Sequence, residues 1–256
     1  MTRLRRGALI GATLLSCLTL TLATANAAPP RWLKAFATFH DTNPSGGLGN
    51  ACGYDDEGLN AIGTMQTAVS TQLFNSGYQC GSRFTVRCRS ELVPQWCLPG
   101  SPEVTVTVTD FCPPNYDLRG DAGGWCNPPR KHFDLSRPAF EQIADPEAGI
   151  VPTMYARSEV NRNTPLRFKM GGLPLANDVL VDSNSASPTK SVSIKGTNTA
   201  WLNMTHAQGV HWEVLQLLQG QALSFKVTDA SGHTVTANNV FPANWQFGQT
   251  ATAPGF

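Results

Sequence analysis

The sequence predicts an all-β protein that consists of two β domains with only short helices. Residues 104–109 alternate strictly between valine and threonine, and this period of two places the two residue types on opposite faces of a strand. Beyond residue 165, short alternating runs recur about every ten residues with Gly, Pro, Asn or Ser turns between them, which is typical of a β-sandwich. Six of the seven cysteines lie within residues 52–126, so the composition also divides the chain in two.

The first residues have the layout of a secretory signal peptide. Three arginines at positions 3, 5 and 6 precede an apolar run over residues 8–22, and small residues follow up to an Ala-x-Ala site that ends at Ala27. A membrane anchor is the alternative, but the apolar run is short for a span and contains Thr and Gly. We therefore expect a signal peptide over residues 1–27, no stable membrane insertion after its cleavage, and a secreted, extracellular protein.

Charge and cysteine content argue against several classes of partner. The 19 basic and 18 acidic residues become 16 and 18 once the three leader arginines are removed, and this balance argues against a nucleic-acid partner. Cys17 leaves with the predicted signal peptide, and an even number of cysteines in an exported chain favours disulfides over a metal site. The chain contains no Cys-x-x-Cys pair and its five histidines are scattered, so the sequence indicates neither a metal site nor a cofactor.

The expected elements follow from hydrophobic periodicity and turn residues. We assign residues 28–157 to the first domain, 158–165 to a polar linker and 166–256 to the second domain. In the first domain we expect strands at residues 35–39, 84–88, 104–109 and 149–157, and helices at residues 64–74 and 137–144. In the second domain we expect strands at residues 166–170, 178–182, 191–195, 222–228 and 234–238.

A loop rich in Pro and Gly lies between two aspartates. Asp110 ends the alternating strand, Cys112 and Cys126 bracket the loop, and the chain returns to Asp134 within a His-Phe-Asp tripeptide. Paired carboxyl groups held in a rigid cleft suit glycosidic chemistry or sugar binding. In the structural alternative each aspartate only caps a turn or a helix, and Asp134 stands where an N-cap would precede a helix beginning near Ser136.

Several motifs together resemble one known family. They are GNACGY, TDFCPPN, GGWCNPP, HFDL, SVSIKG and PANWQFGQT, and they are spread over almost the whole chain after residue 27. The chain resembles the expansins, and within them the α-expansins of plant cell walls. The resemblance implies a double-psi β-barrel related to family-45 endoglucanases, followed by an immunoglobulin-like β-sandwich that binds cellulose. It also implies an activity that loosens walls at acid pH without hydrolysing their polymers.

The resemblance assigns a polysaccharide groove on the barrel to Thr38, Asp110 and Asp134, with His40 beside them where the family has tyrosine. Asp134 matches the general acid of the related hydrolases. An imidazole stacks on sugars less well than a phenol ring and titrates near the pH of the cell wall, so we expect the sugar contacts at His40 to differ from those of the family.

The second carboxylate of a hydrolase has no clear counterpart in this chain. By the same resemblance its position falls on Thr42 and not on Asp41. Because a displacement by one residue turns a strand side chain to the opposite face, Asp41 is a poor substitute for a catalytic base.

The second domain is expected to present aromatic rings to cellulose, whose flat apolar sugar faces favour stacking. The candidates are Tyr155, Trp201 and Trp212, whereas Trp245 is expected to be buried. For each candidate ring the alternative is a place in the core, because a tryptophan in a sandwich is more often packed than displayed. One glycosylation sequon is present at Asn203, in a polar segment.

The resemblance also implies how the six cysteines pair. The implied disulfides are Cys52–Cys80, Cys88–Cys97 and Cys112–Cys126. Each closes a short loop, and closing such a loop contributes a few kcal/mol to stability.

Three functions are compatible with these observations. The leading hypothesis is a secreted expansin, non-enzymatic and acid-activated, that acts in the extracellular wall by disrupting contacts of cellulose with hemicellulose. Its partners would be cellulose, xyloglucan or similar β-glucans. The second is an inverting endo-β-glucanase with Asp134 as the acid. The third is a lectin-like or defence module of the barwin type, and a second domain argues against it because barwin-type proteins lack one.

Overall fold

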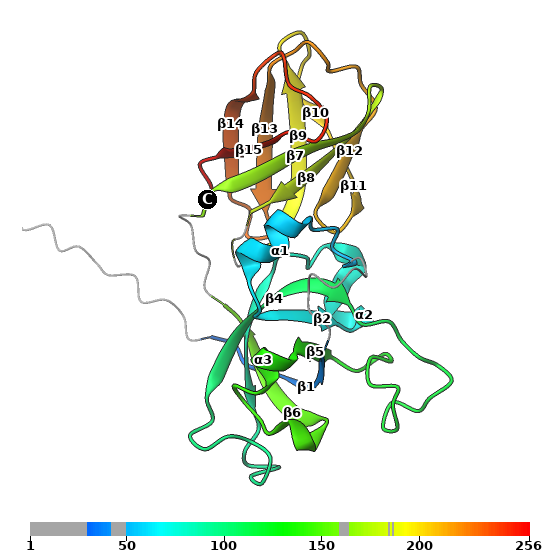
Figure 1. Cartoon of the computed structure of the whole chain (residues 1–256), viewed down its shortest axis with the longest axis vertical. Helices are drawn as coiled ribbons and strands as arrows, with labels where there is room; N and C mark the ends of the chain where they lie inside the picture. The colour runs from blue at the N-terminus through cyan, green and yellow to red at the C-terminus, as the bar shows by residue number, and fades with distance from the viewer. Residues whose placement is uncertain (1–29, 42–49, 159–163, 184, 186) are drawn as a thin grey trace, which may run out of the picture.

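The protein is built from two bodies of β-sheet stacked along its long axis (Figure 1). The computed structural model describes residues 30–41, 50–158, 164–183, 185 and 187–256. The predicted signal peptide and residues 159–163 of the predicted linker lie outside this part of the chain. Among the described residues, no helix is both long and apolar enough to cross a membrane.

The first body is a closed six-stranded barrel. Its strands are β1 (Leu33–His40), β2 (Gln66–Val69), β3 (Arg83–Cys88), β4 (Glu103–Phe111), β5 (His132–Ser136) and β6 (Val151–Arg157). They close in the order β1-β5-β2-β4-β3-β6, with β1 parallel to β5 and β2 parallel to β4. Closure leaves the barrel without an unpaired edge, so every strand has one inward and one outward face.

The inward faces form the barrel core. The valines at positions 104, 106 and 108 alternate into the interior and are buried, as the strand prediction required. The rings of Phe84, Phe133 and Tyr155 contact one another there, with centroids 5.1–5.7 Å apart. The outward faces of the same strands are therefore available for a binding site.

Helices in this body are short. They are α1 (Asp56–Ile62), α2 (Thr71–Phe74) and α3 (Arg137–Phe140), with 3-10 turns η1 (Asn75–Gly77) and η2 (Pro146–Ala148). The helix predicted over residues 64–74 is wrong for residues 66–69, which form β2 and are buried between β4 and β5. Pairing on both sides and complete burial outweigh a helical spacing that is only local.

The N-cap alternative for Asp134 is also wrong. Asp134 lies in the middle of β5, and Ser136 is the residue that precedes α3. The helix predicted over residues 137–144 is an α-helix only over Arg137–Phe140.

The second body is a β-sandwich. Its strands are β7 (Leu166–Leu173), β8 (Ala176–Asp182), β9 (Thr189–Gly196), β10 (Leu202–Asn203), β11 (Thr205–Gln208), β12 (His211–Val214), β13 (Leu223–Asp229), β14 (Thr234–Phe241) and β15 (Thr250–Ala253). One sheet has the order β10-β9-β13-β14 and the other β11-β12-β8-β7-β15. The five strands predicted here all exist, whereas the shorter β10, β11, β12 and β15 were missed because a run of two to four residues shows no clear alternation.

The sandwich core lies between the two sheets. The rings of Phe168 and Phe225 stack across it with centroids 4.4 Å apart. Trp245 is buried, which confirms its prediction, and its indole N–H donates to the carbonyl of Gln221 over 3.1 Å.

The two bodies are joined by direct contacts. The backbone N–H of Val210 donates to the carbonyl of Cys52 over 2.9 Å, and Arg167 donates to the carboxylate of Asp55 over 2.7 Å. Gly209 adopts a φ of +56°, and a Cβ there would lie 2.1 Å from the Cys52 carbonyl oxygen, so only glycine fits. The sandwich therefore rests on the barrel through polar and backbone contacts rather than only through the linker.

Candidate functional site

Four side chains form a row across the outer face of the barrel. Thr38 in β1 is in register with Asp134 in β5, and Ala68 in β2 is in register with both Asp134 and Asp110 in β4. Residues in register on paired strands point to the same face of a sheet. Two strand spacings separate the backbones of Asp110 and Asp134 by roughly 10 Å. The sheet thus brings together three of the groove residues expected from the sequence.

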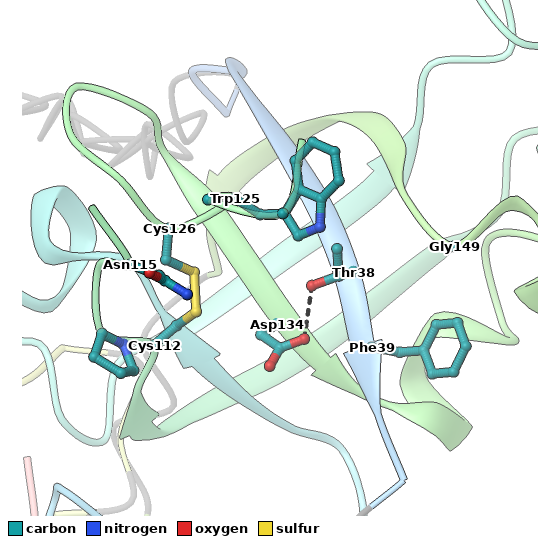
Figure 2. A pocket seen from close by; sticks show the side chains of 11 residues that line it. Thr38, Phe39, Cys112, Asn115, Trp125, Cys126, Asp134 and Gly149 are labelled. Carbon is teal, nitrogen blue, oxygen red and sulfur yellow. Dashed lines mark hydrogen bonds between the residues drawn. A yellow bond between two sulfur atoms is a disulfide. The ribbon is translucent and has the colours of Figure 1, made fainter. Parts of the chain in front are cut away.

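A cavity of about 430 Å³ opens over one part of this row (Figure 2). Its walls are Thr38 and Phe39 of β1, Asp134 of β5, and residues of the loop bracketed by Cys112 and Cys126. Figure 2 shows Thr38, Asp134 and the indole of Trp125 bordering the same open space. Among the described residues, Asp134 is the one carboxylate in the lining.

The loop that forms this wall is held in shape by covalent and polar bonds. The Cys112–Cys126 disulfide closes it, and the Asn127 amide donates to the carbonyls of Asn115 and Leu118 over 2.8 and 2.9 Å. These bonds hold Trp125 half-buried at the cavity. Trp125 is not among the residues that the sequence predicts for the site, although it lies in the GGWCNPP motif next to a bracketing cysteine.

The carboxyl group of Asp134 titrates at higher pH than an ordinary aspartate. Burial raises its pKa most, and the nearby charge of Asp110 raises it further. A hydrogen bond from the hydroxyl of Thr38, 2.7 Å long, and the charge of His40 act in the opposite direction. The net result is a carboxyl group that takes up a proton more readily as the pH falls.

His132 supports Thr38 from behind. It is fully buried, and its Nε2 lies 2.8 Å from the Thr38 hydroxyl oxygen. Burial, with a smaller contribution from Arg130, lowers the pKa of His132 to about 3, so the ring is neutral. While Asp134 is ionised, the single hydroxyl hydrogen of Thr38 goes to the carboxylate, and His132 must donate through Nε2–H. His132 therefore positions Thr38, and Thr38 positions Asp134.

Asp110 has a different role from Asp134. Its Oδ1 accepts the backbone N–H groups of Ala51 and Phe111 over 2.7 and 2.8 Å. Asp110 does not line the cavity, although it influences Asp134 electrostatically. It fastens the segment around Ala51 to the barrel and adds negative charge to the row.

Neither the end of β1 nor Asp41, the described residue that follows it, supplies a second free carboxylate. His40 lies on the same face of β1 as Thr38 and is close enough for its charge to lower the pKa of Asp134. Asp41 pairs with Arg137, and this hydrogen bond holds the pKa of Asp41 below its usual range. Thr42 lies outside the described residues.

Two of the three aromatic rings predicted to contact cellulose are wrong. Tyr155 and Trp212 are 4% and 3% exposed, so neither ring can stack on a polymer surface. Tyr155 belongs to the inward face of β6 in the barrel core, and Trp212 packs in the sandwich core. Trp201 remains partly open, with the Lys226 ammonium 4.4 Å from its ring centroid.

The cysteines form three disulfides, and the sequon asparagine lies on the surface. All three disulfides implied by the resemblance are present, which confirms the pairing. Asn203 is exposed on β10, where its Oδ1 accepts from the hydroxyl of Ser193 over 3.0 Å. Within the described residues no group of three or more His, Cys, Asp or Glu side chains is arranged to hold a metal ion.

Comparison with curated proteins places the chain in a family. It is 42% identical to Expansin-A25 of Oryza sativa subsp. japonica over 235 residues, which cover 91% of this chain and 92% of that protein. The chain belongs to the expansin family. A second relative, Expansin-A23 of Arabidopsis thaliana, is 42% identical to this expansin over 86% of the chain and 78% of its own length.

Family matches and solved structures agree with the two bodies of this expansin. Residues 66–155 match a family described as "Lytic transglycolase", and residues 166–242 match the "Expansin C-terminal domain". An apo expansin of Clavibacter michiganensis superposes with a TM-score of 0.65 at 21% identity, over 88% of this chain and 97% of that one. A mutant of that expansin in complex with cellohexaose gives a TM-score of 0.62 at 20% identity, over 87% and 96%. The predicted double-psi β-barrel followed by a β-sandwich is thereby confirmed.

Proposed function

We propose that this expansin loosens plant-type cell walls without hydrolysing them, by using protonated Asp134 to compete for hydrogen bonds that hold wall polysaccharides together. The observation that carries the proposal is a carboxyl group with a raised pKa, oriented by Thr38, in an open cavity with no second carboxylate among its described lining residues. Membership of the expansin family supports wall loosening as the activity.

The cavity is suited to a sugar chain. The indole of Trp125 offers a flat face for a pyranose ring, while Thr38 and Asp134 offer polar groups to its hydroxyls. Because the Thr38 hydroxyl occupies Oδ1 of Asp134, a proton on Oδ2 can be offered to the ligand. A protonated carboxyl group both donates and accepts, so it can exchange partners with a glucan hydroxyl without breaking a covalent bond.

Acid activation follows from the sign of the pKa shift. A carboxyl group carries its proton below its pKa, so a raised pKa extends the protonated state of Asp134 upward in pH, towards that of an acidified wall. The activity is therefore expected to rise as the pH falls and to follow the titration of this one group.

An inverting endo-β-glucanase remains the second candidate because Asp134 occupies the position of a hydrolytic acid. Such an enzyme also needs a carboxylate base about 6.5–9.5 Å away with room for a water molecule. Oδ1 of Asp110 accepts two backbone N–H groups, and Asp41 is paired with Arg137. Both arrangements favour the non-hydrolytic function.

The proposed partners are β-glucans of the extracellular wall. Cellulose and xyloglucan are the expected polymers, and an expansin of Clavibacter michiganensis has been solved with cellohexaose. With Tyr155 and Trp212 in the cores, Trp201 is the remaining sequence-predicted ring for contact with cellulose.

The test measures creep of isolated walls and release of reducing sugar with the same preparation, between about pH 4 and pH 7, which brackets carboxyl and imidazole titration. Asp134→Asn removes the titrating proton. We expect the creep rate at acid pH to fall several-fold, because the protonated carboxyl group is neutral and a hydrogen bond between neutral groups contributes about 0.5–1.5 kcal/mol. The pH dependence should disappear as well.

The matched control is Asp117→Asn, an exposed aspartate in the same loop, which should creep like the wild type. The proposal is wrong if Asp134→Asn extends acidified walls with an unchanged pH profile. Sugar release that requires Asp134 would instead establish the hydrolase.

A further inference from the structure

A second cavity, of about 570 Å³, lies further along β1. Trp32, Lys34 and Phe36 line one side of it and Arg130 and Lys131 the other. Phe36 is 37% exposed, a large value for a phenylalanine in a strand. The cavity therefore presents aromatic faces and cationic groups side by side.

This cavity adjoins the one at Asp134. Lys34, Phe36 and Thr38 alternate along the outward face of β1, so neighbouring members of the row are about 6–7 Å apart. The guanidinium of Arg130 lies 4.5 Å from the ring centroid of Phe36 in the second cavity and 5.5 Å from that of Trp125 in the first. One extended polymer chain could thus follow β1 from the first cavity into the second.

The charged side chains that line the second cavity are all positive. Lys34, Arg130 and Lys131 line it, no Asp or Glu does, and no ion pair joins any of these three cations to the described carboxylates. The neighbouring Arg87 differs, because it lies over the Trp32 ring and pairs with Glu103 over 3.3 Å. Basic and acidic residues are nearly balanced over the whole chain, so this excess of positive charge is local.

We propose that the second cavity binds the uronate residues of an acidic polysaccharide. A sugar ring would stack on Trp32 or Phe36, and its carboxylate would pair with Arg130, whose planar guanidinium suits bidentate contact with carboxylate oxygens. Stacking on two rings already restricts the guanidinium, so less side-chain freedom is lost on binding. A neutral glucan would leave the three cations without partners. The inference does not depend on the titration of Asp134.

The test compares ligands that differ only in charge. Oligogalacturonate and its methyl ester are titrated into the full-length mature protein by calorimetry at about pH 6, where uronate is ionised. We expect the acid to bind about tenfold or more tightly than the ester, and this preference to weaken between about 50 and 300 mM salt. Cello-oligosaccharide of the same length serves as the neutral glucan.

Three variants separate charge, stacking and fold. The double variant Lys34→Gln/Lys131→Gln keeps Arg130 and should lose part of the preference for the acid, whereas Lys190→Gln/Lys195→Gln in the sandwich removes the same charge and should keep all of it. Trp32→Ala should weaken binding of both the acid and the ester several-fold. These affinities are measured without walls and without creep, so failure of the wall-loosening proposal is distinguishable from failure of this one.

Three results would overturn the inference. The first is equal affinity for the acid and its ester, and the second is an equal loss of preference in the two lysine double variants. The third is that inorganic polyphosphate of matched charge binds as tightly as the uronate and that Trp32→Ala has no effect, because the cavity would then be a general anion-binding surface.

Discussion

Thr38 carries one hydroxyl hydrogen and stands between two groups that could accept it, the carboxylate of Asp134 and the imidazole of His132. Because burial keeps His132 neutral, its Nε2–H donates to Thr38 and leaves the hydroxyl hydrogen for Asp134. A neutral buried ring thus orders the acid without adding a positive charge that would depress its pKa. The carboxyl group is oriented and stays easy to protonate.

Replacing Thr38 tests this chain of hydrogen bonds. Thr38→Val keeps the shape but removes a bond that lowers the pKa of Asp134, so that pKa should rise further and the creep profile should shift to higher pH. His132 loses its partner, which should cost about 1–3 kcal/mol of unfolding free energy. Carboxyl-carbon NMR titration of Asp134 and denaturant unfolding measure the two effects.

Thr105→Val, at an exposed position of β4, provides the comparison and should change neither the titration nor the stability. A shift of the Asp134 pKa to lower values in Thr38→Val would contradict the assigned hydrogen-bond direction.

At the level of elements, the cavity depends on one parallel strand pairing and one loop. Pairing of β1 with β5 places Thr38 beside Asp134, although the two residues are 96 positions apart in the sequence. The loop between Cys112 and Cys126 then covers the row and supplies Trp125. The strands position the acid, and the loop makes the cavity.

The loop's contribution to wall creep can be separated from its contribution to stability. Cys112→Ser/Cys126→Ser and Cys88→Ser/Cys97→Ser each open a short loop and should each cost about 3 kcal/mol of unfolding free energy. Only the first pair borders the cavity, so only that variant should lose wall creep at a temperature where both remain folded. Equal creep by the two folded variants would show that the loop is not part of the site.

At the scale of the whole molecule, the contact between the two bodies includes a histidine with two acceptors. His211 in β12 places Nδ1 2.8 Å from the Asp178 carboxylate and Nε2 2.7 Å from the carbonyl of Gly53 in the barrel. Neither partner can donate, so both bonds exist only when both ring nitrogens carry hydrogen. The hydrogen bond to Asp178, followed by that to Gly53 and nearby negative charge, raises the pKa of His211 although burial opposes it.

This arrangement predicts how stability depends on pH. A group whose pKa is raised by folding contributes its full stability below its unfolded pKa, about 6.5 for histidine, and loses it as the pH rises through the folded pKa. Buried neutral His132 acts in the opposite direction below its unfolded pKa of about 6.5. We therefore expect the unfolding temperature to fall as the pH rises from about 6.5 to 8, with about 1 kcal/mol at stake. His211→Gln should flatten this dependence.

His233→Gln, at an exposed histidine of the sandwich, should keep the wild-type slope. If the slope survives in His211→Gln, the junction is not held by the protonated ring.

Much of the fold could be predicted from the sequence because local patterns carry it. Alternation in residues 104–109 and in the five longer sandwich strands survives in the structure, and the disulfide pairing implied by the family motifs is present. Residues 66–69 could not be predicted, because their apolar spacing fits a helix and only the flanking strands β4 and β5 make them a strand.

The sequence by itself determined the class of fold, the cysteine pairs and the identity of Asp134 as the acid of interest, because period-two alternation and family motifs are readable along one chain. Only the tertiary structure decided which rings face solvent and which carboxylates are available. Tyr155 and Trp212 are in the cores, Trp125 and Phe36 line cavities, and backbone N–H groups occupy Asp110. The physical reason is that exposure and hydrogen-bond partners depend on residues distant in sequence, which meet only when the barrel closes.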